Sequence, residues 1–534
     1  MPEMRVLHAV HGFAPEFRGG VEAYVMALAS AQRARGDDAF VLSGSDHGHA
    51  PARLAEEELS GLPVFRLEGL APHTERLRDR PDGEALVDGL LRRLRPDVLH
   101  VHSWLRLVPN LAAVAASTGI PAVATLHDVA LSCPRVHRLK ADLSFCRVPE
   151  SPGICAPCVR RDPWETDAEV EDELSLRASF LERERSLLVA GLVNSEAQRH
   201  LLEEVGTFSP GVLTVLPVAL PDLPLPADRA ARATPGLDVG HWGNLLPAKG
   251  THLLVAAAAS LPESLGVVVH LFGTAPDPAF GSTLRASAPP GRVVFHGPYS
   301  PSDLPRFPLD AAAFPSLAPE SHSFTLDEAF SLGLPLVVSD AGALPERVGA
   351  RGLVVRAGDE QGLADALRRL AEEPGLLAQM RALPPAEPPI PFQEHLARLD
   401  AVYEQARLAG APARPALPAV EERLLALQRR ASRRRSDAAE ARETTERLRV
   451  EVTSVVRARD VELQRLYDAE VALRTRVAAL EASGAALGER LGQALADLDS
   501  ERHSTGATRG QLEALLSRRS VRLALRLSRL LGRG

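Results

Sequence analysis

The chain of 534 residues is too long for one hydrophobic core, so we expect two or three domains and an additional segment. Hydrophobic residues make up 45% of it and charged residues 24%, a balance that lets most of the chain bury an ordinary core. The formal net charge of -8 argues against a general nucleic-acid-binding protein, which would be strongly basic.

The chain begins MPEMRVLHAVHGF, without the basic start and long apolar run of a signal peptide. No stretch approaches the roughly 20 apolar residues that are needed to cross a bilayer. We therefore expect a cytoplasmic protein that at most contacts the inner face of a membrane.

Strand and helix signals alternate through residues 1–220. The expected strands are Arg5–Val10, Ala39–Ser43, Asp97–His102, Ala122–Leu126, Gly191–Asn194 and Leu213–Pro217. The expected helices are Gly20–Arg35, Glu169–Leu188 and Ser195–Glu204. Strands separated by helices imply parallel βαβ units and a doubly wound α/β sheet.

A proline-rich segment, Leu220–Pro235, has no apolar period and is expected to link two domains. A second alternating series occupies residues 236–384. Its expected strands are Val239–Trp242, Val267–Phe272, Val293–Phe295, Ala311–Phe314, Leu336–Val338 and Leu353–Val355. Its expected helices are Thr251–Ser260, Thr325–Leu332 and Gln361–Glu372. Two Rossmann-like units of this kind leave a cleft between the carboxyl ends of their strands, where ligands bind.

After a closing helix in residues 391–409, the composition changes. Residues 420–500 are rich in Arg, Glu, Ala and Leu and form a predicted helical extension. Apolar residues recur there every seven positions in two seams, Val452, Leu466, Leu473, Leu480 and Leu487, and Val456, Leu463, Val477, Leu491 and Leu498. Arg459, Glu470 and Gly484 interrupt the pattern. The extension is predicted to be either a coiled coil, which would favour a dimer, or a single long solvated helix.

Residues 511–534 carry no acidic residue after Glu513, and their arginines alternate with leucines. At helical spacing the two kinds of side chain collect on opposite faces. Such a basic amphipathic helix could lie on an anionic membrane surface, or it could bind a partner or a second copy.

Two glutamates eight positions apart, Glu320 and Glu328, follow the expected strand that ends at Phe314. A helix is expected to start between them, and its first backbone amides favour an anion such as a diphosphate. A carboxylate before that helix can accept hydrogen bonds from sugar hydroxyls, and one inside it can accept from ribose hydroxyls. Glutamates also occupy solvated helix faces, so their position after a strand is what favours a binding role.

The second domain offers Lys249 in the loop after its first strand, where a lysine would meet a phosphate as a point charge. The first domain offers Gly19 and Gly20 after its own first strand, and paired glycines let a phosphate or sugar approach the backbone closely. Taken alone, these features are a surface lysine and a turn.

In their order along the chain, these features resemble glycosyltransferase family 4, whose members are retaining enzymes of the GT-B fold with two Rossmann-like domains facing a cleft. The resemblance covers roughly residues 4–408. The matching motifs are Gly19-Gly20-Val21-Glu22, RPDVLHVHSW (Arg95 to Trp104), Leu126-His127-Asp128, Val193-Asn194-Ser195-Glu196, Pro247-Ala248-Lys249-Gly250, and the Glu320/Glu328 pair with the following AFSLGLPLVVSDAGALPE.

The resemblance implies a role for each matching residue. Lys249 would hold the donor diphosphate, Glu320 would bind the donor sugar hydroxyls, and Glu328 would bind the ribose. Gly20, next to Gly19, would place a backbone amide near the phosphates. His127 would act with Glu320 in catalysis, in the cleft beside the transferred sugar; otherwise it is a core histidine at a strand end.

The sequence departs from the family pattern at two places. Asn244 stands where family members usually carry an arginine that also contacts the diphosphate, so another basic residue would have to substitute for it. The run that follows the first glutamate contains His322, Ser323 and Phe324 in place of the usual Gly-Phe-Gly-like run. We expect these three residues and Asn244 to line the donor site.

The implied mechanism is front-face transfer with retention at the anomeric carbon. Positive charge develops on the sugar ring and negative charge on the departing diphosphate, which Lys249 and the helix amides would stabilise. Family members of this kind generally need no divalent metal for the leaving group, so no cofactor is expected for catalysis.

All four cysteines, Cys133, Cys146, Cys155 and Cys158, fall in one segment after His127. Four thiolates suit a tetrahedral structural zinc ion, and a related arrangement occurs in some members of the family. The alternatives are four reduced, unligated thiols or a disulfide, which suits a cytoplasmic protein less.

The sequence therefore predicts sugar transfer from a nucleotide-sugar donor to a lipid-linked or growing glycan acceptor, in cell-envelope or exopolysaccharide synthesis. Two other interpretations are a catalytically silent scaffold that works through its helical extension, and a nucleotide-sugar epimerase of similar build. The presence of Lys249, Glu320, Glu328 and His127 favours the transferase, whereas Asn244 is the feature that favours a scaffold.

Overall fold

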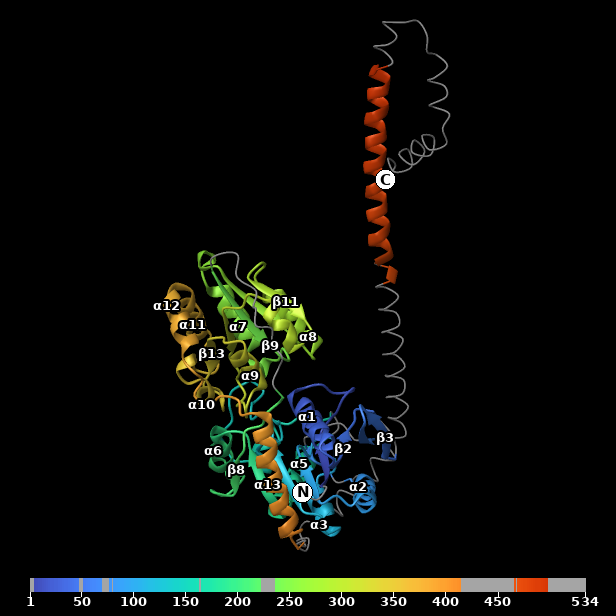
Figure 1. Cartoon of the computed structure of the whole chain (residues 1–534), viewed down its shortest axis with the longest axis vertical. Helices are drawn as coiled ribbons and strands as arrows, with labels where there is room; N and C mark the ends of the chain where they lie inside the picture. The colour runs from blue at the N-terminus through green and yellow to red at the C-terminus, as the bar shows by residue number, and fades with distance from the viewer. Residues whose placement is uncertain are drawn as a thin grey trace. The chain divides into compact units, whose positions relative to one another are not determined.

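A computed structural model describes residues 4–47, 51–69, 76–78, 80–162, 165–221, 236–413, 465–466 and 468–497. The chain divides into two compact units, Met1–Leu427 and Gln428–Gly534 (Figure 1). Most of the expected interdomain linker, residues 420–464 of the extension and the basic segment 511–534 lie outside the described residues.

The first domain is built on an eight-stranded sheet of order β3-β4-β2-β1-β5-β6-β7-β8. The strands are β1 Arg5–Val10, β2 Asp38–Gly44, β3 Arg53–Leu59, β4 Leu62–Glu68, β5 Val98–Val101, β6 Ala122–Leu126, β7 Leu188–Val193 and β8 Leu213–Val215. All neighbours are parallel except β3 and β4. The helices are α1 Gly20–Ala34, α2 Pro81–Leu94, α3 Leu111–Ser117, α4 Pro152–Cys155, α5 Asp167–Leu187 and α6 Glu196–Glu204. The doubly wound α/β architecture is confirmed.

The antiparallel hairpin of β3 and β4 was not among the predicted elements. Its two-residue turn is formed by Ser60 and Gly61, whose φ angles of 54° and 80° are those a type I′ hairpin turn requires. β3 forms the exposed edge of the sheet and carries three consecutive glutamates. It therefore lacks the apolar pattern from which a strand is predicted. Charged residues on an edge strand also discourage pairing with another chain.

The second domain has a six-stranded parallel sheet of order β11-β10-β9-β12-β13-β14. The strands are β9 Leu237–Trp242, β10 Val267–Phe272, β11 Val293–Gly297, β12 Ala311–Phe314, β13 Leu336–Ser339 and β14 Gly352–Val355. The helices are α7 Thr251–Ser260, α8 Pro278–Ser287, α9 Phe324–Ser331, α10 Leu344–Val348, α11 Glu360–Glu372 and α12 Pro374–Ala382. Each expected strand is present, with ends that differ by at most two residues.

The closing helix α13, Phe392–Ala409, returns to the first domain after the second is complete (Figure 1). Its buried residues Phe392, Leu396 and Tyr403 join the core formed by α1 and the first sheet. Arg35 at the end of α1 adds a two-pronged contact to Asp400 of α13, at 2.5 and 2.7 Å. The helix therefore ties the end of the second domain to the first.

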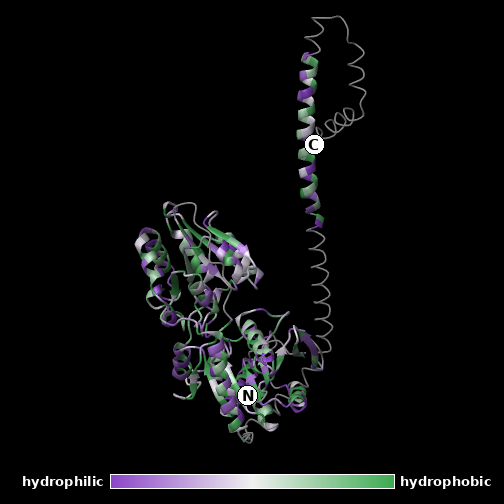
Figure 2. Cartoon of the chain, in the orientation of Figure 1, coloured by the Kyte–Doolittle hydropathy of each residue, from purple (hydrophilic) through white to green (hydrophobic). Residues whose placement is uncertain are grey.

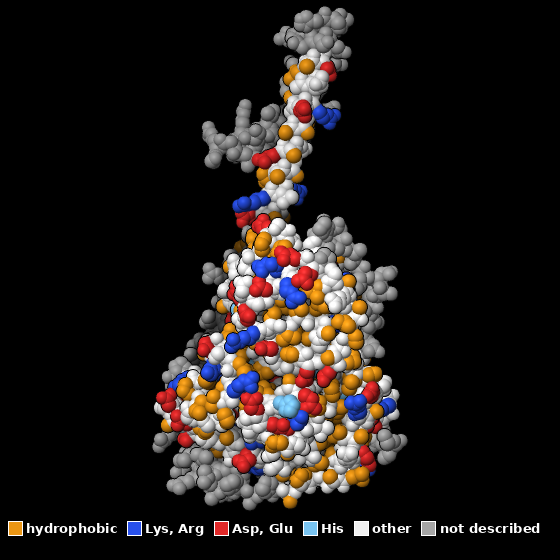
Figure 3. All heavy atoms as spheres, turned by 90° about the vertical axis from the view of Figure 1, so that its left-hand side faces the viewer, with side chains coloured by type: hydrophobic (Ala, Val, Ile, Leu, Met, Phe, Trp, Pro, Cys, Tyr) orange, Lys and Arg blue, Asp and Glu red, His pale blue; other side chains and the backbone are white. Residues whose placement is uncertain are grey.

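In the second unit, residues 468–497 form a helix along which polar and apolar residues are mixed (Figure 2). Four leucines of one predicted seam are exposed, and orange hydrophobic side chains lie along the helix in the space-filling view (Figure 3). They are Leu466 (60%), Leu473 (67%), Leu480 (57%) and Leu487 (46%). Both the coiled coil and the single solvated helix stay open as predictions. Within the part of the chain that the structure describes, none of the helices combines the length and apolar character needed to cross a bilayer.

Candidate active site

Lys249 and Glu320 meet at the carboxyl ends of two neighbouring strands of the second sheet. Lys249 follows β9 and Glu320 follows β12, which pairs with β9 in parallel. The Nζ atom of Lys249 donates to the two carboxylate oxygens of Glu320 at 2.7 and 2.9 Å, and the Ser316 hydroxyl donates to one of them at 2.5 Å. Burial raises the pKa of Glu320, but the charge and hydrogen bonds of Lys249 outweigh it and leave this pKa below its usual value. Glu320 is therefore a pure hydrogen-bond acceptor.

Two glycines let the backbone close around this pair. Gly250 has a φ of 67°, and a Cβ atom there would lie 1.9 Å from the carbonyl oxygen of Pro315. Gly342 has a φ of 64°, and a Cβ atom there would lie 2.2 Å from the carbonyl oxygen of Glu320. Only glycine fits at either position, so both loops are packed directly against the chain that carries Glu320.

Glu328 lies within α9, one helical turn beyond the first residues of that helix. Burial raises its pKa to about 7, while the indole of Trp242 and the hydroxyl of Tyr299 oppose the shift. The Tyr299 hydroxyl lies 3.4 Å from the Glu328 carboxylate. Hydrogen bonds donated by the hydroxyls of a ligand would favour the ionised form of Glu328, so binding of such a ligand would lower this pKa again.

Arg347 holds the loop between the two glutamates in shape. It donates to the carbonyl oxygens of His322 and Ser323 at 3.0 and 3.2 Å and pairs with Asp327, whose carboxylate also contacts His322 Nε2 at 2.9 Å. Ser323 has a left-handed φ of 74° and directly precedes α9, which begins at Phe324. Arg347 was not among the predicted site residues, because nothing in the sequence around it indicates what its side chain contacts.

His322 is buried, with its Nε2 atom engaged by Asp327 and its Nδ1 atom without a hydrogen-bond partner among the described residues. Asn244 is exposed in the loop after β9. Contact of either residue with a donor stays a prediction.

His127 lies at the end of β6 in the first domain and is half-buried. Its Nε2 atom is 3.0 Å from His102 Nδ1, and its ring centroid is 5.2 Å from that of Tyr24. Burial lowers the pKa of His127 to about 3, so the ring is neutral at physiological pH. A small hollow opens beside it, with Trp104 and Asp128 in its wall.

The two domains meet at these residues. The Ser321 hydroxyl, next to Glu320 in the chain, donates to the His127 carbonyl oxygen at 2.5 Å. A Cβ atom on Gly20 would lie 2.9 Å from the Phe324 ring, so the glycine turn of the first domain faces the start of α9. Gly19 precedes it as the residue before α1. The structure therefore brings Lys249 to Glu320, and the segment that follows Glu320 to His127 and Gly20, with Ser316 and Ser321 joining them. Among the described residues, neither Glu328 nor Asn244 has a hydrogen bond to this group.

The four cysteines are all partly buried, and none forms a disulfide. Burial raises the pKa of Cys155, and the nearby Cys133 and Cys158 thiols raise it further. Among the described residues, no three cysteines have sulfur atoms within 4.8 Å of one another, although His8, His100 and His102 have ligand atoms at that spacing. Zinc binding by the cysteines stays a proposal.

Comparison with known proteins agrees with this geometry. Residues 19–149 match the glycosyl transferase 4-like domain, and residues 236–373 match the glycosyl transferases group 1 domain. A glycogen synthase of Mycobacterium tuberculosis is 26% identical over 408 residues, which cover 71% of this chain and 88% of that protein. A D-inositol 3-phosphate glycosyltransferase of Arthrobacter sp. is 27% identical over 399 residues, which cover 68% and 84%.

Among solved structures, the catalytic domain of starch synthase IV from Arabidopsis thaliana, bound to ADP and acarbose, superimposes with a TM-score of 0.51 at 15% identity. The match covers 76% of this chain and all of that one, and it establishes the shared fold. The two family matches, one in each α/β domain, identify a glycosyltransferase, and the shared fold is of the GT-B type. The chain belongs to glycosyltransferase family 4.

Proposed function

We propose that this enzyme moves a sugar from a nucleotide-sugar donor to a glycan or lipid-linked acceptor, with retention at the anomeric carbon. The observation that carries the proposal is the Lys249–Glu320 pair, with Glu328 on the following helix and His127 reached through Ser321. The names of the two relatives, and the ADP and acarbose of the starch synthase structure, support a nucleotide-bearing donor and a polyhydroxylated acceptor.

The side chains divide the work of the transfer step. The Lys249 side chain is 42% exposed. On donor binding it would give up part of its contact with Glu320 and turn toward the departing diphosphate. Glu320 would then accept hydrogen bonds from sugar hydroxyls, and its charge favours the positive charge that develops on the ring. The first amides of α9 would add electrostatic stabilisation of the leaving group. Closure of the two domains would exclude water, which would otherwise consume the donor.

The test is nucleotide release by the full chain with a panel of nucleotide sugars and glycan acceptors. The sequence contains two lysines, Lys140 and Lys249, and Lys140 is exposed. Lys140→Ala is therefore a matched control for Lys249→Ala. We expect Lys249→Ala to lose roughly 10²–10³-fold in kcat, the cost of removing one preorganised electrostatic donor, and Lys140→Ala to lose nothing. Absence of nucleotide release would favour a silent scaffold, and sugar alteration without an acceptor would favour an epimerase.

We further propose that the helical extension pairs with a second copy through the exposed leucine seam. The exposed fractions of Leu473 and Leu480, 67% and 57%, are high for leucines and support this role. Light scattering of the full chain and of a Leu473→Glu/Leu480→Glu variant tests it. A dimer that becomes a monomer is expected, and equal masses would refute the pairing.

Two finer proposals concern acceptor and metal. The arginine–leucine pattern of residues 511–534 supports contact with an anionic membrane that carries a lipid-linked acceptor in cell-envelope or exopolysaccharide synthesis. Vesicle sedimentation of the chain with and without this segment tests the contact.

The cysteine segment is proposed to bind a structural zinc ion, and elemental analysis of the purified chain tests that.

A further inference from the structure

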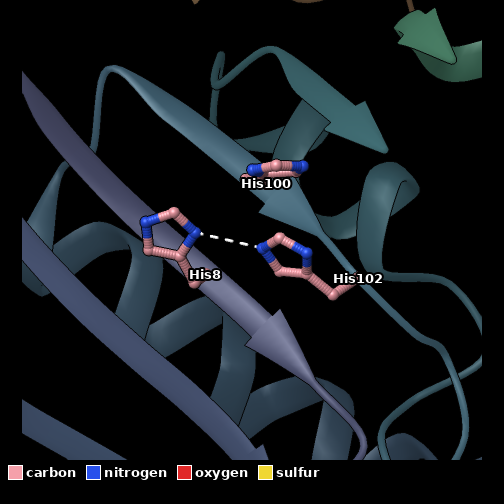
Figure 4. A group of neighbouring side chains, drawn as sticks. All are labelled: His8, His100 and His102. Carbon is pink, nitrogen blue, oxygen red and sulfur yellow. Dashed lines mark hydrogen bonds between the residues drawn. The ribbon is translucent and has the colours of Figure 1, made fainter. Parts of the chain in front are cut away.

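A cluster of buried histidines lies in the first sheet, outside the residues assigned so far. His8 on β1 pairs in register with His100 on β5, and His102 follows two residues later on the same face (Figure 4). Their spacing would admit a metal ion, yet every ring nitrogen already has a hydrogen-bond partner. The partners are Gln32 and His102 for His8, Thr125 and Tyr403 for His100, and His8 and His127 for His102. The ring nitrogens are therefore engaged in a hydrogen-bond network, and they do not present free lone pairs to a common point where a metal ion could bind.

One branch of this network ends at His127. The Oε1 atom of Gln32, on α1, lies 2.8 Å from His8 Nε2. The other nitrogen of His8, Nδ1, lies 3.1 Å from His102 Nε2, the contact drawn in Figure 4. His102 Nδ1 then lies 3.0 Å from His127 Nε2. Gln32, His8 and His102 are all buried.

The Gln32 amide is placed with its Oε1 atom toward His8, while its Nε2 atom is buried without a partner among the described residues, and this orientation sets the direction of every bond in the branch. An amide oxygen only accepts, so His8 Nε2 must carry the proton that is donated to Gln32. A neutral imidazole has one donor and one acceptor, so His8 Nδ1 accepts from His102 Nε2. By the same rule, His102 Nδ1 accepts from His127 Nε2. Burial favours neutral rings throughout, because it lowers the pKa of His8 to about 4 and that of His127 to about 3.

We propose that Gln32, His8 and His102 are positioning residues that hold His127 in its Nε2–H tautomer, so that His127 Nδ1 presents a lone pair to a sugar hydroxyl in the transfer site. Within the described residues Nδ1 has no hydrogen-bond partner, and it is not among the buried polar atoms that lack one. The half-buried ring therefore leaves this atom open. The inference deepens the proposed function and rests on it for the identity of the hydroxyl.

The first test is histidine NMR on the isotope-labelled full chain, with His127 assigned by the signal lost in His127→Ala. The wild type should show an unprotonated Nδ1 and a protonated Nε2 on His127 across the neutral pH range. His102→Phe breaks the branch and should leave His127 as a mixture of tautomers. His100→Phe is the matched control, because His100 is equally buried, its ring centroid lies 3.9 Å from that of His102, and it lies outside the branch. It should keep the wild-type tautomer.

Kinetics gives the second readout. Loss of a supporting hydrogen bond should lower kcat by roughly 10-fold in His102→Phe with little change in the donor KM, and leave kcat of His100→Phe unchanged. Gln32 provides a further variant at the far end of the branch. Gln32→Leu removes the acceptor of His8 Nε2 and should give the same mixture of tautomers on His127 and a similar loss of kcat.

The outcomes separate the inference from the proposed function. A protonated Nδ1 on His127 in the wild type overturns the inference, and so does an equal kcat loss in His100→Phe and His102→Phe without a change of tautomer. If the tautomer pattern is as expected and no nucleotide sugar is turned over, the positioning network stands and the proposed function fails.

Discussion

Replacing Gly342 by alanine tests how tightly the structure fixes Glu320. The new Cβ atom would lie 2.2 Å from the Glu320 carbonyl oxygen and 2.5 Å from its backbone nitrogen, whereas ordinary contact begins at 3.4 Å. The Glu320 backbone would therefore have to move by roughly 1 Å, a displacement that can cost about 10²-fold in rate when it shifts a catalytic group. Overpacking adds about 1–3 kcal/mol of lost stability to the roughly 1 kcal/mol that alanine pays at a φ of 64°.

Gly291 offers a control for the backbone term alone. Its φ of 74° is similar, and nothing lies within 4 Å of a Cβ atom built there. Gly291→Ala should therefore lower stability by only about 1 kcal/mol and leave kcat/KM unchanged. Thermal unfolding and nucleotide release of both variants provide the assay. Equal losses of Tm and of kcat/KM in Gly342→Ala and Gly291→Ala would refute the reasoning.

Two further predictions concern the charged groups of the site. Because burial raises the pKa of Glu328 from 4.5 to about 7, the folded state holds this proton more tightly than the unfolded state, and stability falls as the pH rises through that window. Glu328→Gln should be more stable than the wild type above pH 7 and lose this advantage below pH 4.5, as urea unfolding at the two pH values will show; a constant difference would contradict the shift. Arg347→Ala leaves the half-buried Asp327 without its cation and should cost about 3 kcal/mol, because the Arg347 side chain is 3% exposed and that of Asp327 only 18%. Arg306→Ala, which removes a partner from a pair whose arginine is 76% exposed, should cost at most about 1 kcal/mol in the same urea titration, and a similar cost for both would contradict the role of Arg347.

Most of the fold could be predicted because buried parallel strands leave continuous apolar runs in the sequence. Val267–Phe272 and Thr251–Ser260 were expected with the bounds that the structure shows. The β3–β4 hairpin was missed because an exposed edge strand needs no apolar face. The return of α13 to the first domain could not be predicted either, since an amphipathic helix does not indicate which surface covers it.

The candidate site was predictable only where the residues follow strand ends. Lys249 and Glu320 each come after a strand, so the parallel sheet alone places them on one edge. Arg347 lies outside that pattern, and its contacts with the loop depend on how α10 packs. The histidine branch was equally hidden: the spacing of His100 and His102 places them on one face, but their contact with His8 depends on the pairing of β1 with β5.

The central claim is that groups of the second domain converge on one diphospho-sugar that faces His127. The most direct measurement is an experimental structure of the full chain with a nucleotide-sugar donor that stabilises it. We expect the diphosphate at Lys249 and the start of α9, the ribose at Glu328, and sugar hydroxyls at Glu320. A donor bound away from Lys249, with Glu320 and Glu328 uncontacted, would contradict it.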